Sequence, residues 1–264
     1  MSNILNEIIE KRRQSVETKT VSLAELKARY NDREDFRPFH RNLCNEAGEN
    51  HAAIIAEIKR ASPAKGLFAP DLDPVAVAKE YEVGGAACIS VLTEPNYFYG
   101  SIDDLIAARK HCSLPILQKD FVVTEYQVYE SAIHADAVLL IARCLQTSQL
   151  AELHALATEL KLDVLVEVFD EEDVEKIEPF HFPLIGINHR NLKTMDVSLD
   201  RSCELIVRFD SDQTVVAASG ITTRNDIERY FTVGIRCFLV GESLSRASNR
   251  IEVLNEFVNG DKSC

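Results

Sequence analysis

Eight short apolar runs alternate with amphipathic stretches, and this rhythm limits the folds that the chain can adopt. Continuous runs of seven or eight residues rich in Val, Ile and Leu are typical of parallel strands buried on both faces. Such strands, joined by helices through right-handed crossovers, close into a (β/α)8 barrel when the unit repeats eight times. The runs lie at 52–59, 86–93, 114–121, 137–144, 163–170, 183–190, 215–221 and 237–243.

The segments between the runs carry apolar residues at helical spacing, as expected for the outer layer of a barrel. Examples are 74–83, 103–112, 149–160 and 224–231. An open, doubly wound sheet is the alternative fold, but the G-x-G-x-x-G motif expected after its first strand is absent from the sequence. The Gly84–Gly85 pair follows a helical stretch and is interpreted as a helix cap.

Residues 1–48 are predicted to form a helical extension before the barrel, and the 264 residues are predicted to form one domain. Two amphipathic helices are expected within 3–30, with Ser22 and Glu25 forming a capping box at the start of the second. The polar segment 35–50 is interpreted as an irregular connector.

A formal net charge of −13 argues against nucleic acid and anionic membranes as partners, because both require a basic surface. It is compatible with a phosphorylated small molecule held by backbone N–H groups. Seven scattered cysteines without a C-x-x-C pair indicate free thiols, and the histidine spacing predicts no metal site. With no signal peptide and no long apolar run, we expect a cytoplasmic protein that is a monomer or a weak homodimer.

Charged and amide residues follow the apolar runs, at the ends that converge on one rim of a parallel barrel. Lys59, Lys119 and Glu167 would meet there if each points inward, and burying such charges is costly unless they pair or bind a ligand. We therefore expect an active site rather than a plug of satisfied ion pairs. The residues at the strand ends are Glu57, Lys59, Lys119, Asp120, Glu167, Asn188, Arg190, Ser219, Glu242 and Ser243.

The last two strand ends favour a phosphate site. Ser219-Gly220 and Gly241-Glu242-Ser243 provide glycine turns at the two places where barrels often bind phosphate through backbone N–H groups.

Several blocks together resemble the signature of the indole-3-glycerol phosphate synthase family, in the same order along the chain. The resemblance extends from about residue 1 to residue 257, and no second barrel follows, which suggests a monofunctional enzyme. The blocks are IIAEIKRASPAKG (54–66), SVLTEPNYFYGS (90–101), PILQKDF (115–121), ADAVLLIARCL (135–145), LVEV (165–168), GINHRNL (186–192) and FLVGESL (238–244).

The resemblance implies a carboxy-lyase reaction of tryptophan biosynthesis without metal or cofactor. Ring closure, decarboxylation and dehydration would convert 1-(2-carboxyphenylamino)-1-deoxyribulose 5-phosphate into indole-3-glycerol phosphate. Lys119 would be the general acid, with a pKa lowered by neighbouring cations. Lys59 would be the second catalytic lysine, and Glu167 the general base of the dehydration.

The resemblance also assigns positioning and binding roles. Glu57 would hold Lys119 or the substrate amine, while Asn188 and Arg190 would complete the polar shell. Phe98 and Phe121 would enclose the anthranilate ring. The other substrate-binding residues would be Glu242 and the phosphate-binding set Ser62, Ser219, Gly220, Gly241 and Ser243.

One departure from the family pattern concerns the seventh strand, which usually ends E-S-G-I. Here Ala218 stands in place of the carboxylate, and its loss is expected to slow catalysis. Two alternatives to an active synthase stay open: a phosphate-ligand-binding barrel with impaired catalysis, and a Schiff-base aldolase that uses Lys59 or Lys119.

Overall fold

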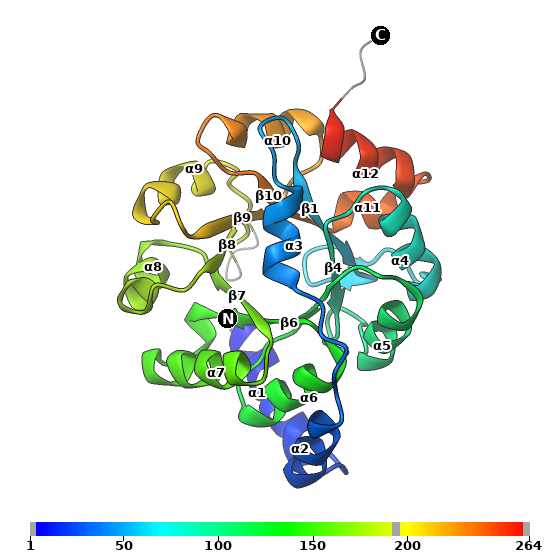
Figure 1. The fold of residues 1–264 in the computed structure, drawn as a ribbon, viewed down its shortest axis with the longest axis vertical. Helices are drawn as coiled ribbons and strands as arrows, with labels where there is room; N and C mark the ends of the chain where they lie inside the picture. The colour runs from blue at the N-terminus through cyan, green and yellow to red at the C-terminus, as the bar shows by residue number, and fades with distance from the viewer. Residues whose placement is uncertain (1–3, 192–195, 261–264) are drawn as a thin grey trace.

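The computed structural model describes residues 4–191 and 196–260, and its centre is a closed barrel of eight parallel strands (Figure 1). β1 pairs in parallel with both β4 and β10, which closes the sheet and excludes the open-sheet alternative. The predicted (β/α)8 barrel is therefore confirmed. The strands are β1 Ala53–Ile58, β4 Cys88–Leu92, β5 Ile116–Lys119, β6 Ala137–Ile141, β7 Asp163–Val168, β8 Leu184–Asn188, β9 Thr214–Ala218 and β10 Cys237–Val240.

Each of the eight predicted apolar runs corresponds to one barrel strand, and every strand ends before its run does. The last residues of the runs enter the loops, as in 142–144, where a 3-10 turn follows β6, whereas Lys119 and Asn188 are the last paired residues of their strands. Nearly all barrel residues are buried, because the helical layer covers the outside of the sheet and side chains fill the inside.

Helices surround the barrel, and the four predicted helical stretches correspond to α4, α5, α7 and α10 (Figure 1). Gly84 caps α4, as predicted, and Asp103 and Asp226 lie in first helical turns, where a carboxylate suits the helix dipole. The outer helices are α4 Pro74–Val83, α5 Ile102–His111, α6 Glu125–His134, α7 Thr147–Glu159, α8 Glu171–Ile177, α9 Arg201–Leu205, α10 Arg224–Phe231, α11 Glu242–Arg246 and α12 Arg250–Asn259. Short 3-10 turns are η1 Ala142–Cys144, η2 Glu178–Phe180 and η3 Ile206–Arg208.

The N-terminal extension contains α1 (Ile4–Glu17) and α2 (Leu23–Asn31), and the predicted capping box of Ser22 and Glu25 is present. The predicted connector is wrong in part, because α3 (Phe39–Glu46) forms within it. The segment 35–50 is polar in composition, but two of its apolar residues, Phe39 and Leu43, are fully buried in the structure.

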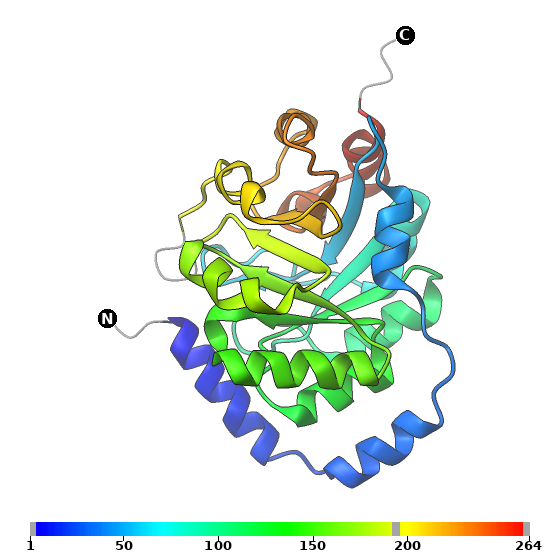
Figure 2. The same cartoon turned by 60° about the vertical axis from the view of Figure 1, so that its left-hand side comes forward.

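α3 covers the end of the barrel where the strands begin. The His40 backbone N–H donates to Asp163 at the start of β7, and its ring lies 2.9 Å from the hydroxyl of Thr214 at the start of β9. α1 lies on the opposite side of the barrel from α3, next to the ends of the strands (Figure 2). The two parts of the extension therefore cover the two ends of the barrel.

Free thiols were predicted, and the cysteines of the described residues are free, with Cys88 and Cys237 among the buried ones. Cys264 lies outside the described residues. No helix in the described ranges is long and apolar enough to cross a bilayer.

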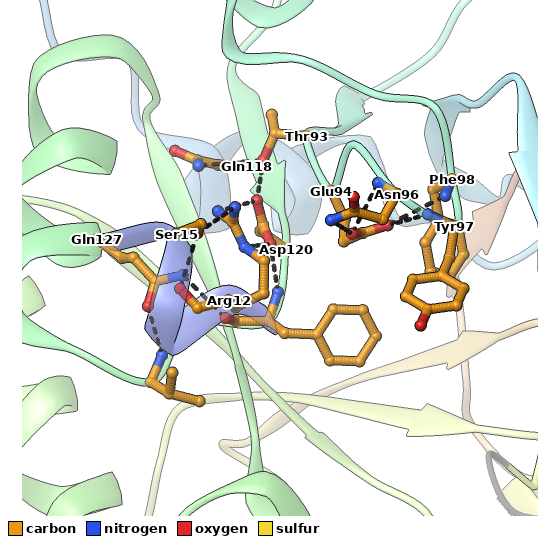
Figure 3. Close-up of polar contacts among 12 residues, drawn as sticks. Arg12, Ser15, Thr93, Glu94, Asn96, Tyr97, Phe98, Gln118, Asp120 and Gln127 are labelled. Carbon is orange, nitrogen blue, oxygen red and sulfur yellow. Dashed lines mark hydrogen bonds and ion pairs between the residues drawn. The ribbon is translucent and has the colours of Figure 1, made fainter. Parts of the chain in front are cut away.

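A buried ion pair fixes α1 to the barrel (Figure 3). Arg12 Nη2 donates to Asp120 Oδ2 at 2.9 Å, and Arg12 Nε makes a 2.9 Å ion-pair contact with Oδ1 without an aligned hydrogen bond. The Thr93 hydroxyl also donates to this carboxylate. Because Asp120 directly follows Lys119, the pair joins the extension to a predicted catalytic strand end.

Removing the cation of this pair should destabilise the protein. Arg12→Met leaves the Asp120 carboxylate buried without its charge partner, so we expect the free energy of unfolding to fall by about 3–5 kcal/mol. Urea unfolding followed by circular dichroism measures the change. The matched control is Arg13→Met, which alters the next, exposed residue and should cost less than about 0.5 kcal/mol. Equal losses in the two variants would show that the ion pair does not anchor α1.

Candidate active site

A cavity of about 470 Å³ opens where the strands of the barrel end. The residues predicted for the site come from seven strand ends and the loops after them, and the closed barrel brings them to this one cavity. Their chemical roles stay predictions. The lining includes Glu57, Lys59, Ser62, Phe98, Lys119, Phe121, Glu167, Asn188, Arg190, Ser219, Gly220, Gly241, Glu242 and Ser243.

A carboxylate from β7 contacts side chains from the ends of β5 and β8. Lys119 Nζ lies 3.5 Å from Glu167 Oε2, and Asn188 Nδ2 donates to Glu167 Oε1 at 2.9 Å. Glu167 is almost fully buried, so these two partners replace the water that its charge would otherwise hold. The arrangement fixes an ammonium and a carboxylate side by side, as acid–base chemistry requires.

The pKa of Lys119 differs in direction from the sequence-based expectation. Burial lowers the pKa, but the negative charges of Glu167 and Glu57 and the hydrogen bond to Glu167 outweigh it, so the pKa is raised. The expectation of a lowered pKa was wrong because carboxylates, rather than cations, surround the amine. Lys119 is therefore an ammonium group at neutral pH.

Glu57 pairs with Lys59 instead of Lys119. Lys59 Nζ donates to Glu57 Oε1 at 2.6 Å, and both side chains are largely buried. The pair lies against Gly241, where an added Cβ would come within 2.3 Å of Glu57 Oε1 and 2.9 Å of Lys59 Nζ. A glycine at this position is therefore necessary for the ion pair to pack against the end of β10.

The turn after β9 has an unusual backbone. Ser219 and Gly220 have φ values of 74° and 80°, a region that residues other than glycine rarely adopt. An added Cβ on Gly220 would lie 2.5 Å from Val197 Cγ1. The Ser243 hydroxyl donates to the carbonyl of Ile221 at 2.6 Å and so connects this turn to the start of α11. The two glycine turns thus lie side by side, as the predicted phosphate site requires.

Two aromatic rings form another wall of the cavity. The ring centroids of Phe98 and Phe121 are 6.1 Å apart, and the ring planes are inclined by 40°. The apolar side chains of Leu5 and Ile8 line the same cavity from α1. This part of the cavity suits a flat apolar group.

Comparison with known proteins agrees with this architecture. The family model for indole-3-glycerol phosphate synthase matches residues 5–257. The chain belongs to the indole-3-glycerol phosphate synthase family. A family member from Desulfosudis oleivorans is 48% identical over 98% of this chain and 99% of its own length. Another, from Leptothrix cholodnii, is 42% identical over 94% of this chain and 96% of its own. Leu192, which ends one of the family blocks, lies outside the described residues.

The fold also resembles that of a thiamine phosphate pyrophosphorylase from Pyrococcus furiosus, with a TM-score of 0.55 at 15% identity. The match covers 79% of this chain and 95% of the other. At this identity the likeness concerns the barrel fold alone.

Sequence reasoning for this family member missed the contribution of the N-terminal extension to the cavity. Ile4, Leu5 and Ile8 line it, yet their spacing in the sequence indicated only an amphipathic helix. A helical pattern identifies the apolar face of α1 but not the surface that this face covers. Arg246 was also missed, since it lies one turn into α11 rather than at a strand end.

One group in the described part of the chain offers three possible metal ligands. His181, Asp210 and Asp212 are exposed, and they precede β8 and β9. They therefore lie at the opposite end of the barrel from the cavity and take no part in it.

His189 supports the turn after β9 from outside the barrel. Its fully buried ring contacts Ser202 and stacks on Tyr230. Its Nδ1 lies 2.7 Å from the carbonyl oxygen of Ser219, which only accepts, so Nδ1 carries the proton and Nε2 accepts from Ser202. Burial lowers the pKa of His189 to about 4.

The lowered pKa of His189 should make stability depend on pH. An unfolded histidine titrates near pH 6.5, so the neutral buried ring contributes fully above that pH, and its contribution is lost as pH falls toward 4. We expect His189→Gln to remove about 3 kcal/mol of pH-dependent stability across this interval. Urea unfolding measured at several pH values tests this, with the exposed His111→Gln as the control. A variant with the same pH slope as the parent would contradict the assignment.

Proposed function

We propose that the protein converts 1-(2-carboxyphenylamino)-1-deoxyribulose 5-phosphate into indole-3-glycerol phosphate, with release of carbon dioxide and water, as its family membership implies. The observation that carries the proposal is the placement of Lys119 and Glu167 between an aromatic wall and a pair of glycine turns. The aryl group, the ketone and the phosphate of the substrate would each meet one of these parts. The steps need only protein acids and bases.

Lys119 is the proposed general acid of ring closure. As the aryl carbon attacks the ketone carbon, the ketone oxygen gains negative charge and takes a proton from the Lys119 ammonium group. The raised pKa of Lys119 keeps that proton available, and Glu167 fixes the direction of Nζ. The carboxyl group then leaves as carbon dioxide. The two electrons of the broken carbon–carbon bond return to the ring system.

Lys59 and Glu167 are proposed to act in the dehydration. Lys59, held by Glu57, would protonate the departing hydroxyl group, and Glu167 would remove the proton that restores aromaticity. Asn188 holds Glu167 in position for this transfer. Arg190 would neutralise the substrate carboxylate until it leaves.

Backbone N–H groups are proposed to bind the phosphate at the two glycine turns. Ser219, Gly220, Gly241 and Ser243 surround this end of the cavity, and Ser62 approaches from the loop after β1, which contains the two-stranded hairpin of β2 (Ala61–Ser62) and β3 (Gly66–Leu67). Glu242 is in contact with Arg246, 3.2 Å from its Nε, so its negative charge is compensated beside the phosphate.

We further propose that the chain is a single domain that acts in the cytoplasm, as a monomer or a weak homodimer. The free thiols of the described residues suit a reducing compartment, and the hydrophobic core is continuous from α1 to α12.

Lys119→Ala is expected to lower kcat by about 100-fold to 10,000-fold, with a smaller effect on KM, because it removes an acid that acts in the transition state. Indole fluorescence under steady-state conditions measures both constants. Lys110→Ala, an exposed change on α5, is the control and should behave like the parent. A Lys119→Ala variant with near-parental kcat would exclude the proposed acid, and a parent without turnover would exclude the proposed function.

Ala218 lines the cavity at the end of β9, where the family pattern has a carboxylate. Ala218→Glu should therefore raise kcat by up to about 100-fold, by adding a negative charge beside the cationic intermediates. The same fluorescence assay tests it, with Ala217→Ser as a neighbouring control in the strand. An unchanged kcat would mean that Ala218 does not slow catalysis. Binding without turnover in the parent, relieved by Ala218→Glu, would favour the phosphate-binding alternative.

A further inference from the structure

Glu94 is a fully buried carboxylate that the proposed mechanism does not use. It lies two residues after β4, and four hydrogen bonds from the next residues satisfy it. Oε1 accepts from the backbone N–H and the side-chain amide of Asn96, at 2.9 and 3.2 Å. Oε2 accepts from the backbone N–H groups of Tyr97 and Phe98, at 2.7 and 3.1 Å (Figure 3).

The loop that surrounds this carboxylate is tight. The N–H of Gly100 donates to the Glu94 carbonyl at 3.0 Å, and an added Cβ on Gly100 would lie 2.0 Å from the Leu92 carbonyl oxygen. Tyr99 has a φ of 54°, which is unfavourable for a residue with a side chain. The chain therefore folds back directly over the end of β4, and the Glu94 carboxylate is its central anchor.

Phe98 connects this anchor to the cavity. Its backbone N–H donates to Glu94 Oε2, while its ring lines the cavity beside that of Phe121. A carboxylate that holds the main chain at Phe98 and Tyr97 fixes where the Phe98 side chain begins and so limits where its ring can lie. We propose that Glu94 is a positioning residue that sets the Phe98 ring for the aryl group of the substrate. This inference rests on the proposed function.

Phe121, the other ring of the aromatic wall, has a similar device. Asp120 Oδ1 accepts from the backbone N–H of Phe121 at 2.7 Å. Asp120 is also paired with Arg12, so changing it leaves a buried cation without its partner. The hydrogen bonds to Glu94 come from neutral N–H groups, so a substitution of Glu94 leaves no buried cation without its partner. Glu94 is therefore the better residue at which to test ring positioning.

Glu94→Gln keeps the size of the side chain but replaces one acceptor oxygen with an NH2 group, which faces N–H groups and cannot accept from them. The main chain at Phe98 should then be held less tightly, and the position of the Phe98 ring should vary more. We expect the affinity for anthranilate, used as a probe of the aryl pocket, to fall about fivefold to tenfold. The affinity for inorganic phosphate should change less than about twofold, since phosphate is proposed to bind at the glycine turns.

The decisive experiment is a double-mutant cycle of Glu94→Gln and Phe98→Ala, read by anthranilate fluorescence and by calorimetry with phosphate. If Glu94 acts through Phe98, the double variant should bind anthranilate as Phe98→Ala does, within about twofold. Additive losses, or parental anthranilate affinity in Glu94→Gln, would overturn the proposal, as would a parent that binds no anthranilate. Turnover of the parent, measured separately, tests the proposed function itself.

Glu82→Gln is the matched control. Glu82 also accepts a backbone N–H, that of Ser113 at 2.8 Å, but this contact precedes β5 at the other end of the barrel. It should leave anthranilate affinity unchanged, and an equal loss there would assign the effect to general destabilisation. If Glu94→Gln does not fold, Glu94→Asp keeps the charge with a shorter reach and should show a partial loss in the same cycle.

Discussion

Parallel pairing of β1 with β10 is the constraint on which the rest of this structure depends. Once the first strand lies beside the last, every strand has two neighbours, and the ends of all eight strands face the same side. Residues as distant in sequence as Lys59 and Ser243 then line one cavity. No local preference of the chain could bring them together, so the chemistry of the site is a product of barrel closure.

Charge balance is the second organising feature of the cavity. The two lysines at its strand ends are each matched by a carboxylate, Glu57 for Lys59 and Glu167 for Lys119. Buried ions without such partners would cost several kcal/mol each. The pairing compensates both charges while leaving the two amines partly exposed at the cavity surface, where the proposed substrate could reach them. The polar site can therefore persist without a ligand.

Much of the fold was predictable because strands buried on both faces have a strong signal in the sequence. The cavity residues at the strand ends were predictable for the same reason, since alternation along a strand and convergence at one rim place Lys119, Glu167 and Asn188, whereas those from α1 were not. The pairing of the lysines with the carboxylates was not predictable from the sequence. Which carboxylate holds which lysine depends on side-chain positions in the folded barrel, and the raised pKa of Lys119 follows from the carboxylates that surround it there. α3 escaped prediction because only Phe39 and Leu43 reveal its buried face.

The contact between Arg12 and Asp120 joins residues 108 positions apart. During synthesis, α1 leaves the ribosome before β5, whose end carries Asp120. The helix can therefore form this ion pair only after more than a third of the barrel strands have been made. The apolar face of α1 lines the cavity, so this wall can form only after β5 and its Asp120 have been made. The cavity is therefore completed by a contact between segments that are synthesised far apart in time.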